Sequence, residues 1–161
     1  MPSPIVVRRA ASDEGDEIGA LTLQAYAGDR VVDAEYAKEL GDGTTRVRDA
    51  HVLVAVAGLR LVGSVTLAVH GTPFAEIAEP GEIEVRMLGV APDARRHGIA
   101  DLLMDGAEAH ARTLGLAGVV LSTAPHMTAA HALYDRRGYL PQPHRDWHID
   151  DLHLLAYRLA L

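Results

Sequence analysis

A short basic turn between an apolar strand and an amphipathic helix constrains the fold of this chain more than any other feature. The turn reads Arg95-Arg96-His97-Gly98-Ile99-Ala100, and the apolar residues 87–90 before it are typical of a strand end. After it, apolar side chains recur at helical spacing as far as Leu114. The free N–H groups and the dipole at the start of such a helix favour a bound anion. The sequence therefore predicts a strand–turn–helix unit that binds a phosphate.

Each residue of this turn suits an anionic ligand. Gly98 lets the backbone approach a bulky anion where a Cβ would collide, and Ala100 is small for the same reason. Arg95 and Arg96 bring positive charge, and a guanidinium matches a phosphate better than an ammonium does. Taken alone, the six residues fit an ordinary exposed turn equally well, because short glycine motifs match often.

Length and composition predict one domain over residues 1–161. The chain has 161 residues, of which 48% are hydrophobic, enough for one core and too few for two. No segment approaches the ~20 apolar residues that span a bilayer, and Arg8 and Arg9 interrupt any signal-peptide core. We expect a cytoplasmic protein without a membrane partner, and an alanine- and arginine-rich composition with a single lysine suggests a GC-rich bacterial genome.

Charge and residue usage exclude several classes of function. A net charge of −7 argues against nucleic-acid binding and is compatible with a cationic amine substrate. The absence of cysteine excludes thiol nucleophiles, Fe–S clusters and disulfides. Nine histidines are present, but no His-Glu-x-x-His motif and no carboxylate cluster accompanies them, so no metal site is expected.

The hydrophobic periods predict an α/β domain with a mixed sheet, in the order β-α-α-β-β-β-α-β-α-β-β. Ser12 is the expected N-cap of the first helix, and residues 41–45 are expected to form a loop. Strands are predicted at residues 5–7, 51–57, 61–69, 82–90, 118–122, near 147 and at 152–159, and helices at 12–26, 33–40, 99–114 and 127–137.

Sequence patterns between residues 82 and 139 together resemble the GNAT superfamily of N-acetyltransferases. Arg95, Gly98 and Ala100 match the acyl-CoA signature Gln/Arg-x-x-Gly-x-Gly/Ala. The family's pattern for the preceding strand and turn is matched by Leu88, Val90, Ala91 and Pro92. Its second signature, on a later helix, is matched by Ala130, Leu133, Tyr134, Gly138 and Tyr139. In element order the resemblance extends from about Val6 to Leu159. It implies a central mixed, mostly antiparallel sheet flanked by about four helices, with acetyl-CoA as co-substrate.

The resemblance also assigns the cofactor-binding residues. The backbone amides of Arg96, His97, Gly98, Ile99 and Ala100 would hold the CoA pyrophosphate, with Arg95 beside them. The backbone of Leu88, Gly89 and Val90 would pair with the pantetheine arm as an added strand, and Ser122 and Thr123 would line the opposite wall. Met127 departs from the family, which often has an asparagine there; a thioether cannot donate the corresponding hydrogen bond.

Tyr134 and Glu84 are the catalytic candidates. By the resemblance, Tyr134 would protonate the departing CoA thiolate, and a phenol is a suitable acid for that step; the alternative is a packing role. Glu84 would take a proton from the amine, with Glu82 as the rival base and a structural ion pair with Arg86 as the alternative. Glu82, Glu84, Arg86 and Leu88 are expected on one strand face if no bulge intervenes.

We therefore expect an acyl-CoA-dependent N-acyltransferase that acts on a small-molecule or peptide amine by direct attack in a ternary complex. The alternatives are a non-catalytic acyl-CoA sensor of the same fold and a nucleotide-binding protein without CoA specificity. Tyr26, Asp29, Asp33 and Tyr36 are candidates to shape the acceptor site. His144, Trp147 and His148 would either rim the acceptor pocket or cover the sheet, and a homodimer through the final strands is left open.

Overall fold

The structure, a computed structural model that describes residues 3–27 and 32–161, is a mixed α/β fold. Its strands are β1 (Ile5–Arg9), β2 (His51–Ala57), β3 (Arg60–Val69), β4 (Glu82–Val90), β5 (Gly118–Thr123), β6 (Leu140–Pro141), β7 (Trp147–Ile149) and β8 (Leu152–Ala160). Its helices are α1 (Gly15–Ala25), α2 (Ala34–Gly41), α3 (Gly43–Asp49), α4 (Ile99–Thr113) and α5 (Thr128–Arg136), with single 3₁₀ turns at Pro92–Ala94 and Pro143–Arg145.

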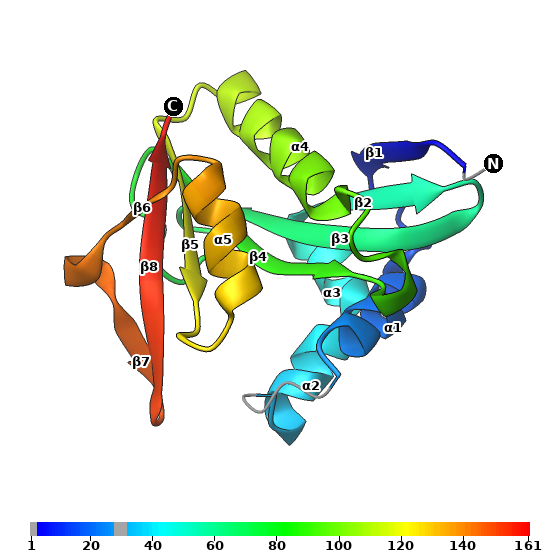
Figure 1. Ribbon diagram of the computed structural model, residues 1–161, viewed down its shortest axis with the longest axis horizontal. Coiled ribbons are helices and arrows are strands. Elements are labelled where there is room, and N and C mark those ends of the chain that lie inside the picture. The colour runs from blue at the N-terminus through cyan, green and yellow to red at the C-terminus, as the bar shows by residue number, and fades with distance from the viewer. Residues whose placement is uncertain (1–2, 28–31) are drawn as a thin grey trace.

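One continuous sheet runs in the order β1-β2-β3-β4-β5-β8-β6, and β7 pairs with β8. Within the described residues, β4 and β5 are the parallel pair and the other neighbours are antiparallel. In Figure 1, α4 and α5 lie over the near face, and α1 and α3 lie behind it. The expected mixed, mostly antiparallel sheet is confirmed, and no described helix has the length and apolarity needed to cross a membrane.

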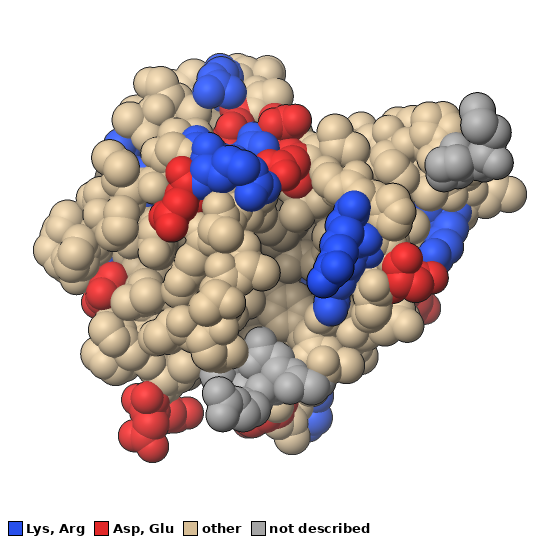
Figure 2. Space-filling model, viewed as in Figure 1, with Lys and Arg blue, Asp and Glu red and all other residues tan. Residues whose placement is uncertain are grey.

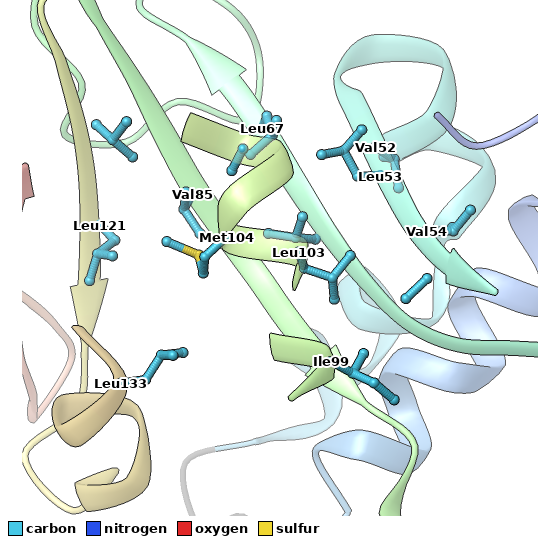
Figure 3. Close-up of a cluster of buried hydrophobic side chains, with 14 of the residues drawn as sticks. Val52, Leu53, Val54, Leu67, Val85, Ile99, Leu103, Met104, Leu121 and Leu133 are labelled. Carbon is cyan, nitrogen blue, oxygen red and sulfur yellow. The ribbon is translucent and has the colours of Figure 1, made fainter. Parts of the chain in front are cut away.

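The helix α4 carries the centre of the hydrophobic core. Its side chains Ile99, Leu103 and Met104 are at most 3% exposed and pack toward the strands, between Leu53 and Leu67 on one side and Leu121 and Leu133 on the other (Figure 3). Burying each such side chain contributes about 1.5–3 kcal/mol relative to leaving it exposed. This packing fixes the first turn of α4 at the end of β4.

Two predictions near the N-terminus were wrong. The first helix begins after Glu14 rather than Ser12; the Glu14 carboxylate accepts hydrogen bonds from the Ala11 N–H and from Arg8. Residues 43–49, predicted to begin in a loop, form α3, whose cap is Asp42 accepting from the Thr45 N–H. The sequence of α3 has only Val47 as an apolar side chain, so it lacks the repeat of apolar residues that would predict a helix.

A bulge interrupts β4. Arg86 pairs with Thr66 of β3 but Gly89 pairs with Ser64, so β4 has one extra residue over this stretch. Met87 takes up the extra residue with a left-handed φ of 53°. Ile83 and Val85 lie in the core and Leu88 packs against it. The expectation that Leu88 shares a face with Glu84 and Arg86 is therefore wrong, because the alternation changes phase at the bulge.

Candidate active site

The site is a cleft that opens where β4 and β5 diverge. Their parallel pairing runs from Glu82 opposite Gly118 to Val85 opposite Leu121 and extends no further, and the two strands separate beyond it in Figure 1. The cleft occupies about 1370 Å³, and Figure 2 shows the hollow with basic side chains on one rim. The divergence of β4 and β5 thus opens this cavity.

Beyond Val85, the edge of β4 that faces this cleft pairs with no strand of the described residues. The Ala91 N–H donates to Val62 of β3, and alternate residues of a strand point their peptide groups to opposite edges. The peptide groups of Leu88 and Val90 therefore point away from β3, toward the cleft. The Tyr26 hydroxyl donates to the Leu88 carbonyl oxygen at 3.1 Å. An extended ligand can pair with this edge as an added strand.

The turn before α4 is open toward the cleft. Arg96 and Gly98 have left-handed φ values of 67° and 72°, which direct successive N–H groups to one side. No atom of the described residues lies within 4 Å of the position that a Gly98 Cβ would take. The first N–H groups of α4, including that of Ala100, have no partner within the helix. This geometry suits an anion on the backbone.

The side chains of the turn differ from the prediction. Arg95 lines the cleft, but its Nη2 donates to the Ala25 carbonyl at the end of α1 at 2.8 Å. His97 does not line the cleft, and its Nδ1 lies 3.0 Å from the Ala94 carbonyl oxygen. Arg96 lines the cleft with an exposed side chain. Arg96 is thus the arginine of the turn better placed to supply charge.

The end of β5 supplies the other wall. Ser122 accepts a hydrogen bond from the Trp147 indole at 2.9 Å. Thr123 is 3% exposed, and its hydroxyl has no hydrogen-bond partner in the described structure. An unpaired buried hydroxyl costs free energy, so a ligand that bonded it would gain that energy. Thr123 lines the cleft, where the resemblance places it.

Tyr134 lies on α5 at the wall of the cleft. It is 6% exposed, and its ring packs against Tyr139 and Tyr157 at centroid distances of 5.7 and 6.4 Å. No hydrogen bond to its hydroxyl is found among the described residues. Burial raises the pKa of Tyr134 to about 12, so the phenol is protonated at neutral pH. The side chain both packs and presents a proton donor to the cleft.

The two acidic residues of β4 have different surroundings. Glu84 lines the cleft at 1% exposure, and its Oε1 accepts the N–H groups of residues 76, 77 and 78 at 2.7–3.0 Å. Burial raises the pKa of Glu84 despite these bonds. Burial would also raise the pKa of Glu82, but hydrogen bonds from Arg145 and Arg158 bring it to about 2. Glu82 does not line the cleft, so it does not fit the role of rival base.

Several weaker predictions are now resolved. Arg86 pairs with Glu39 and Glu76, at 3.5 and 3.9 Å. Trp147 lines the cleft, whereas His144 and His148 do not, and His148 stacks on His153 of β8. The cleft is also lined by Met127, at the start of α5, and by the acceptor candidates Tyr26, Asp33 and Tyr36, while Asp29 lies outside the described residues. Where the chain is described, no three metal-ligating side chains come together.

Sequence reasoning missed the carboxylates Glu39 and Glu76. They reach the cleft from α2 and from the loop before β4 and meet at Arg86. The i, i+4 spacing of Glu35 and Glu39 places both on one face of α2, which was the available signal. Which wall that face would meet depends on tertiary packing.

Comparison with known proteins agrees with this geometry. The model of the acetyltransferase (GNAT) family matches residues 17–139. A mycothiol acetyltransferase of Geodermatophilus obscurus is 39% identical over 90 residues, which are 56% of this chain and 29% of that protein's length. The chain thus spans under a third of that relative.

Solved structures show the same fold at low identity. A GNAT-family acetyltransferase of Staphylococcus aureus superposes with a TM-score of 0.76 at 14% identity, covering 98% of this chain and 99% of that one. The PaiA N-acetyltransferase of Thermoplasma acidophilum, in complex with coenzyme A, gives 0.73 at 14% identity, with 97% and 99% covered. A Brucella melitensis GNAT acetyltransferase, in complex with acetyl-CoA, gives 0.68 at 18%, with 98% and 88% covered. The chain belongs to the acetyltransferase (GNAT) family.

Proposed function

We propose that this chain is an N-acetyltransferase that moves the acetyl group of acetyl-CoA to a primary amine, acting as one domain over residues 1–161. The observation that carries the proposal is the cleft between β4 and β5, which joins an open helix N-terminus, a free strand edge and the unpaired Tyr134 hydroxyl. The family membership supports the reaction class. The acceptor, a small molecule or a peptide, is left to the experiment.

The cleft residues fit the parts of acetyl-CoA. The open turn at Gly98 and the first N–H groups of α4 suit the pyrophosphate. The cleft-facing edge of β4 at Leu88 and Val90 suits the amide-bearing pantetheine arm, whereas Gly89 pairs with Ser64 of β3. The Thr123 hydroxyl gains a partner when that arm lies beside it. When bound, acetyl-CoA supplies an activated thioester carbonyl. The chain's part is to align it with the amine.

Two proton transfers complete the reaction. The amine nitrogen attacks the thioester carbonyl carbon, so that a C–N bond forms and the C–S bond breaks. Glu84 takes the amine proton, directly or through one water, by its oxygen that does not accept the three loop N–H groups. Tyr134 donates its proton to the thiolate. The burial that raises the pKa of Tyr134 also disfavours a bare thiolate in the same cleft, which keeps this transfer feasible.

Thiol release from acetyl-CoA, measured with a panel of primary amines, tests the proposal. We expect release that depends on the amine and stoichiometric N-acetylated product by mass spectrometry. Tight CoA binding without release for every amine would indicate an acyl-CoA sensor instead. ATP binding as tight as CoA binding would indicate a general nucleotide site.

The variant Glu84→Gln tests the base. It keeps an oxygen to accept the three loop N–H groups but removes the charge, so kcat/KM should fall by about 10²-fold and the acidic limb of its pH profile should disappear. Glu79→Gln, on the same loop but outside the cleft, is the matched control and should behave as wild type. An unchanged pH profile in Glu84→Gln would assign the proton to water alone.

A further inference from the structure

A group of charged side chains lies in the cleft away from α4. Glu35 and Glu39 reach it from α2, and Glu76 from the loop before β4, around Arg86. Arg86 precedes Val90 by four residues, which is about 13 Å along a strand at ~3.3 Å per residue. The basic turn follows Val90 in the opposite direction. The charged group and the open turn therefore mark two ends of one cleft.

Where the chain is described, these two ends carry opposite charge. Arg95, Arg96 and Arg136 line the α4 end, where Asp101 is the opposing carboxylate. At the α2 end, the described lining residues of α2 with its cap, of the loop before β4 and of β4 itself include the carboxylates Asp33, Glu35, Glu39, Glu76 and Glu84 and the cations Lys38 and Arg86. A phosphate-bearing ligand fits the first end, and a cation fits the second.

Arg86 does not reverse the charge of the α2 end. Its side chain is 15% exposed, and Nη1 lies 3.5 Å from Glu39, 3.9 Å from Glu76 and 3.3 Å from the Phe74 carbonyl oxygen. One guanidinium between two carboxylates leaves a negative charge over. The side chains of Glu39 and Glu76 are 42% and 44% exposed. Each can therefore take a second cation from the cleft.

The cleft beside this charged group has further features of a ligand-binding site. Among the residues that the structure describes, the buried Thr123 hydroxyl has no partner, and the hydroxyl of Tyr134, a side chain that is 6% exposed, has no hydrogen bond. Both residues line the same cleft as the carboxylates. The acidic group thus borders a cleft whose wall has hydrogen-bonding groups available to a ligand.

We propose that the acceptor is a diamine or polyamine, whose second ammonium group binds among Glu35, Glu39 and Glu76 while the first reacts. This inference rests on the proposed function, since it names the acceptor of that same site. The ammonium group at the far end of the acceptor determines which amines bind well. The remote cation holds the molecule in place, and the reacting amine loses its proton near Glu84.

Calorimetric titration of the full chain, with and without saturating CoA, tests the inference without turnover. The ligands are 1,4-diaminobutane, butylamine and 4-aminobutyrate, which share a four-carbon amine and differ in the charge at the far end. We expect the diamine to bind at least tenfold more tightly than butylamine, and 4-aminobutyrate to bind most weakly. The diamine's advantage should shrink as salt rises, because the carboxylates are partly exposed.

Variants locate the effect. Glu39→Gln and Glu76→Gln should each weaken diamine binding by about fivefold, the upper range for a partly exposed ion pair, and leave butylamine binding unchanged. Glu17→Gln, an exposed acid of α1 outside the cleft, should change neither. Equal or tighter binding of butylamine or 4-aminobutyrate would overturn the inference, even with thiol release intact. Absence of thiol release with every amine, while the diamine still bound, would refute the proposed function instead.

Discussion

The variant Tyr134→Phe removes one oxygen atom from the cleft wall and nothing from the packing of α5. The ring keeps its contacts with Tyr139 and Tyr157, and the lost hydroxyl has no hydrogen bond in the described structure. Removing a hydroxyl that has no partner among the described residues costs little stability. The melting temperature should therefore stay close to the wild-type value. Any loss of activity can then be assigned to chemistry.

The expected loss is large. A positioned general acid contributes about 10²–10⁴-fold, so kcat should fall at least about 10²-fold, which corresponds to about 2.7 kcal/mol of barrier. CoA affinity should stay within about twofold of wild type, because the hydroxyl is assigned to the leaving sulfur. The raised pKa of about 12 means that the wild-type donor stays protonated through pH 10. Tyr134 should therefore cause no alkaline loss of kcat below about pH 11.

The same helix end supplies a matched control. The Tyr139 hydroxyl donates to Glu108 at 3.0 Å in a buried hydrogen bond. Tyr139→Phe should lose about 1.5–3 kcal/mol of stability, or several degrees in melting temperature, with kcat nearly unchanged. Continuous thiol detection at saturating acetyl-CoA, beside thermal melts, measures both quantities. Full kcat in a normally folded Tyr134→Phe protein would refute the role of general acid.

Other residues give separate tests. Gly98→Val should weaken CoA binding at least tenfold, as measured by calorimetry. Gly115→Val is its control, because Gly115 has a similar φ of 70° and equally open surroundings. Both variants should lose about 1–2 kcal/mol of stability, and equal CoA affinities of the two variants would contradict the phosphate site. Thr123→Val should keep or gain thermal stability but lose about fivefold in acetyl-CoA affinity, since its hydroxyl lacks a partner until the ligand binds; unchanged affinity would remove it from the site. Burial and the stacked His110 ring hold the pKa of His51 at about 4, below its ordinary value of 6.5, so the unfolded chain takes up that proton first and stability should fall as the pH drops from 6.5 to 4. His51→Phe should flatten this fall in thermal melts across that range.

The elements around the site could be predicted from the sequence because their signals lie within short stretches of the chain. The strand at 82–90, the basic turn and the helix from Ile99 follow from apolar periodicity and from one glycine where a left-handed turn occurs. The family signatures sit on these same elements. The helix α3 was missed because its stability comes from the Asp42 cap and from Arg46, which donates to the carbonyl oxygens of Glu39 and Leu40.

The chemistry of the site depended on contacts between distant residues. The sequence by itself determined the order of the elements other than α3 and β6, the turn at Gly98 and the presence of Tyr134 and Glu84, since each follows from neighbours a few positions away. Only the tertiary structure decided that Arg95 would bond to Ala25, 70 residues earlier, and that Glu84 would hold the loop at residues 76–78. It alone brought α2 to β4 and so made an acidic end to the cleft. Side-chain partners and pKa values are set by burial and by what packs opposite, and both exist only once the sheet and its helices have assembled.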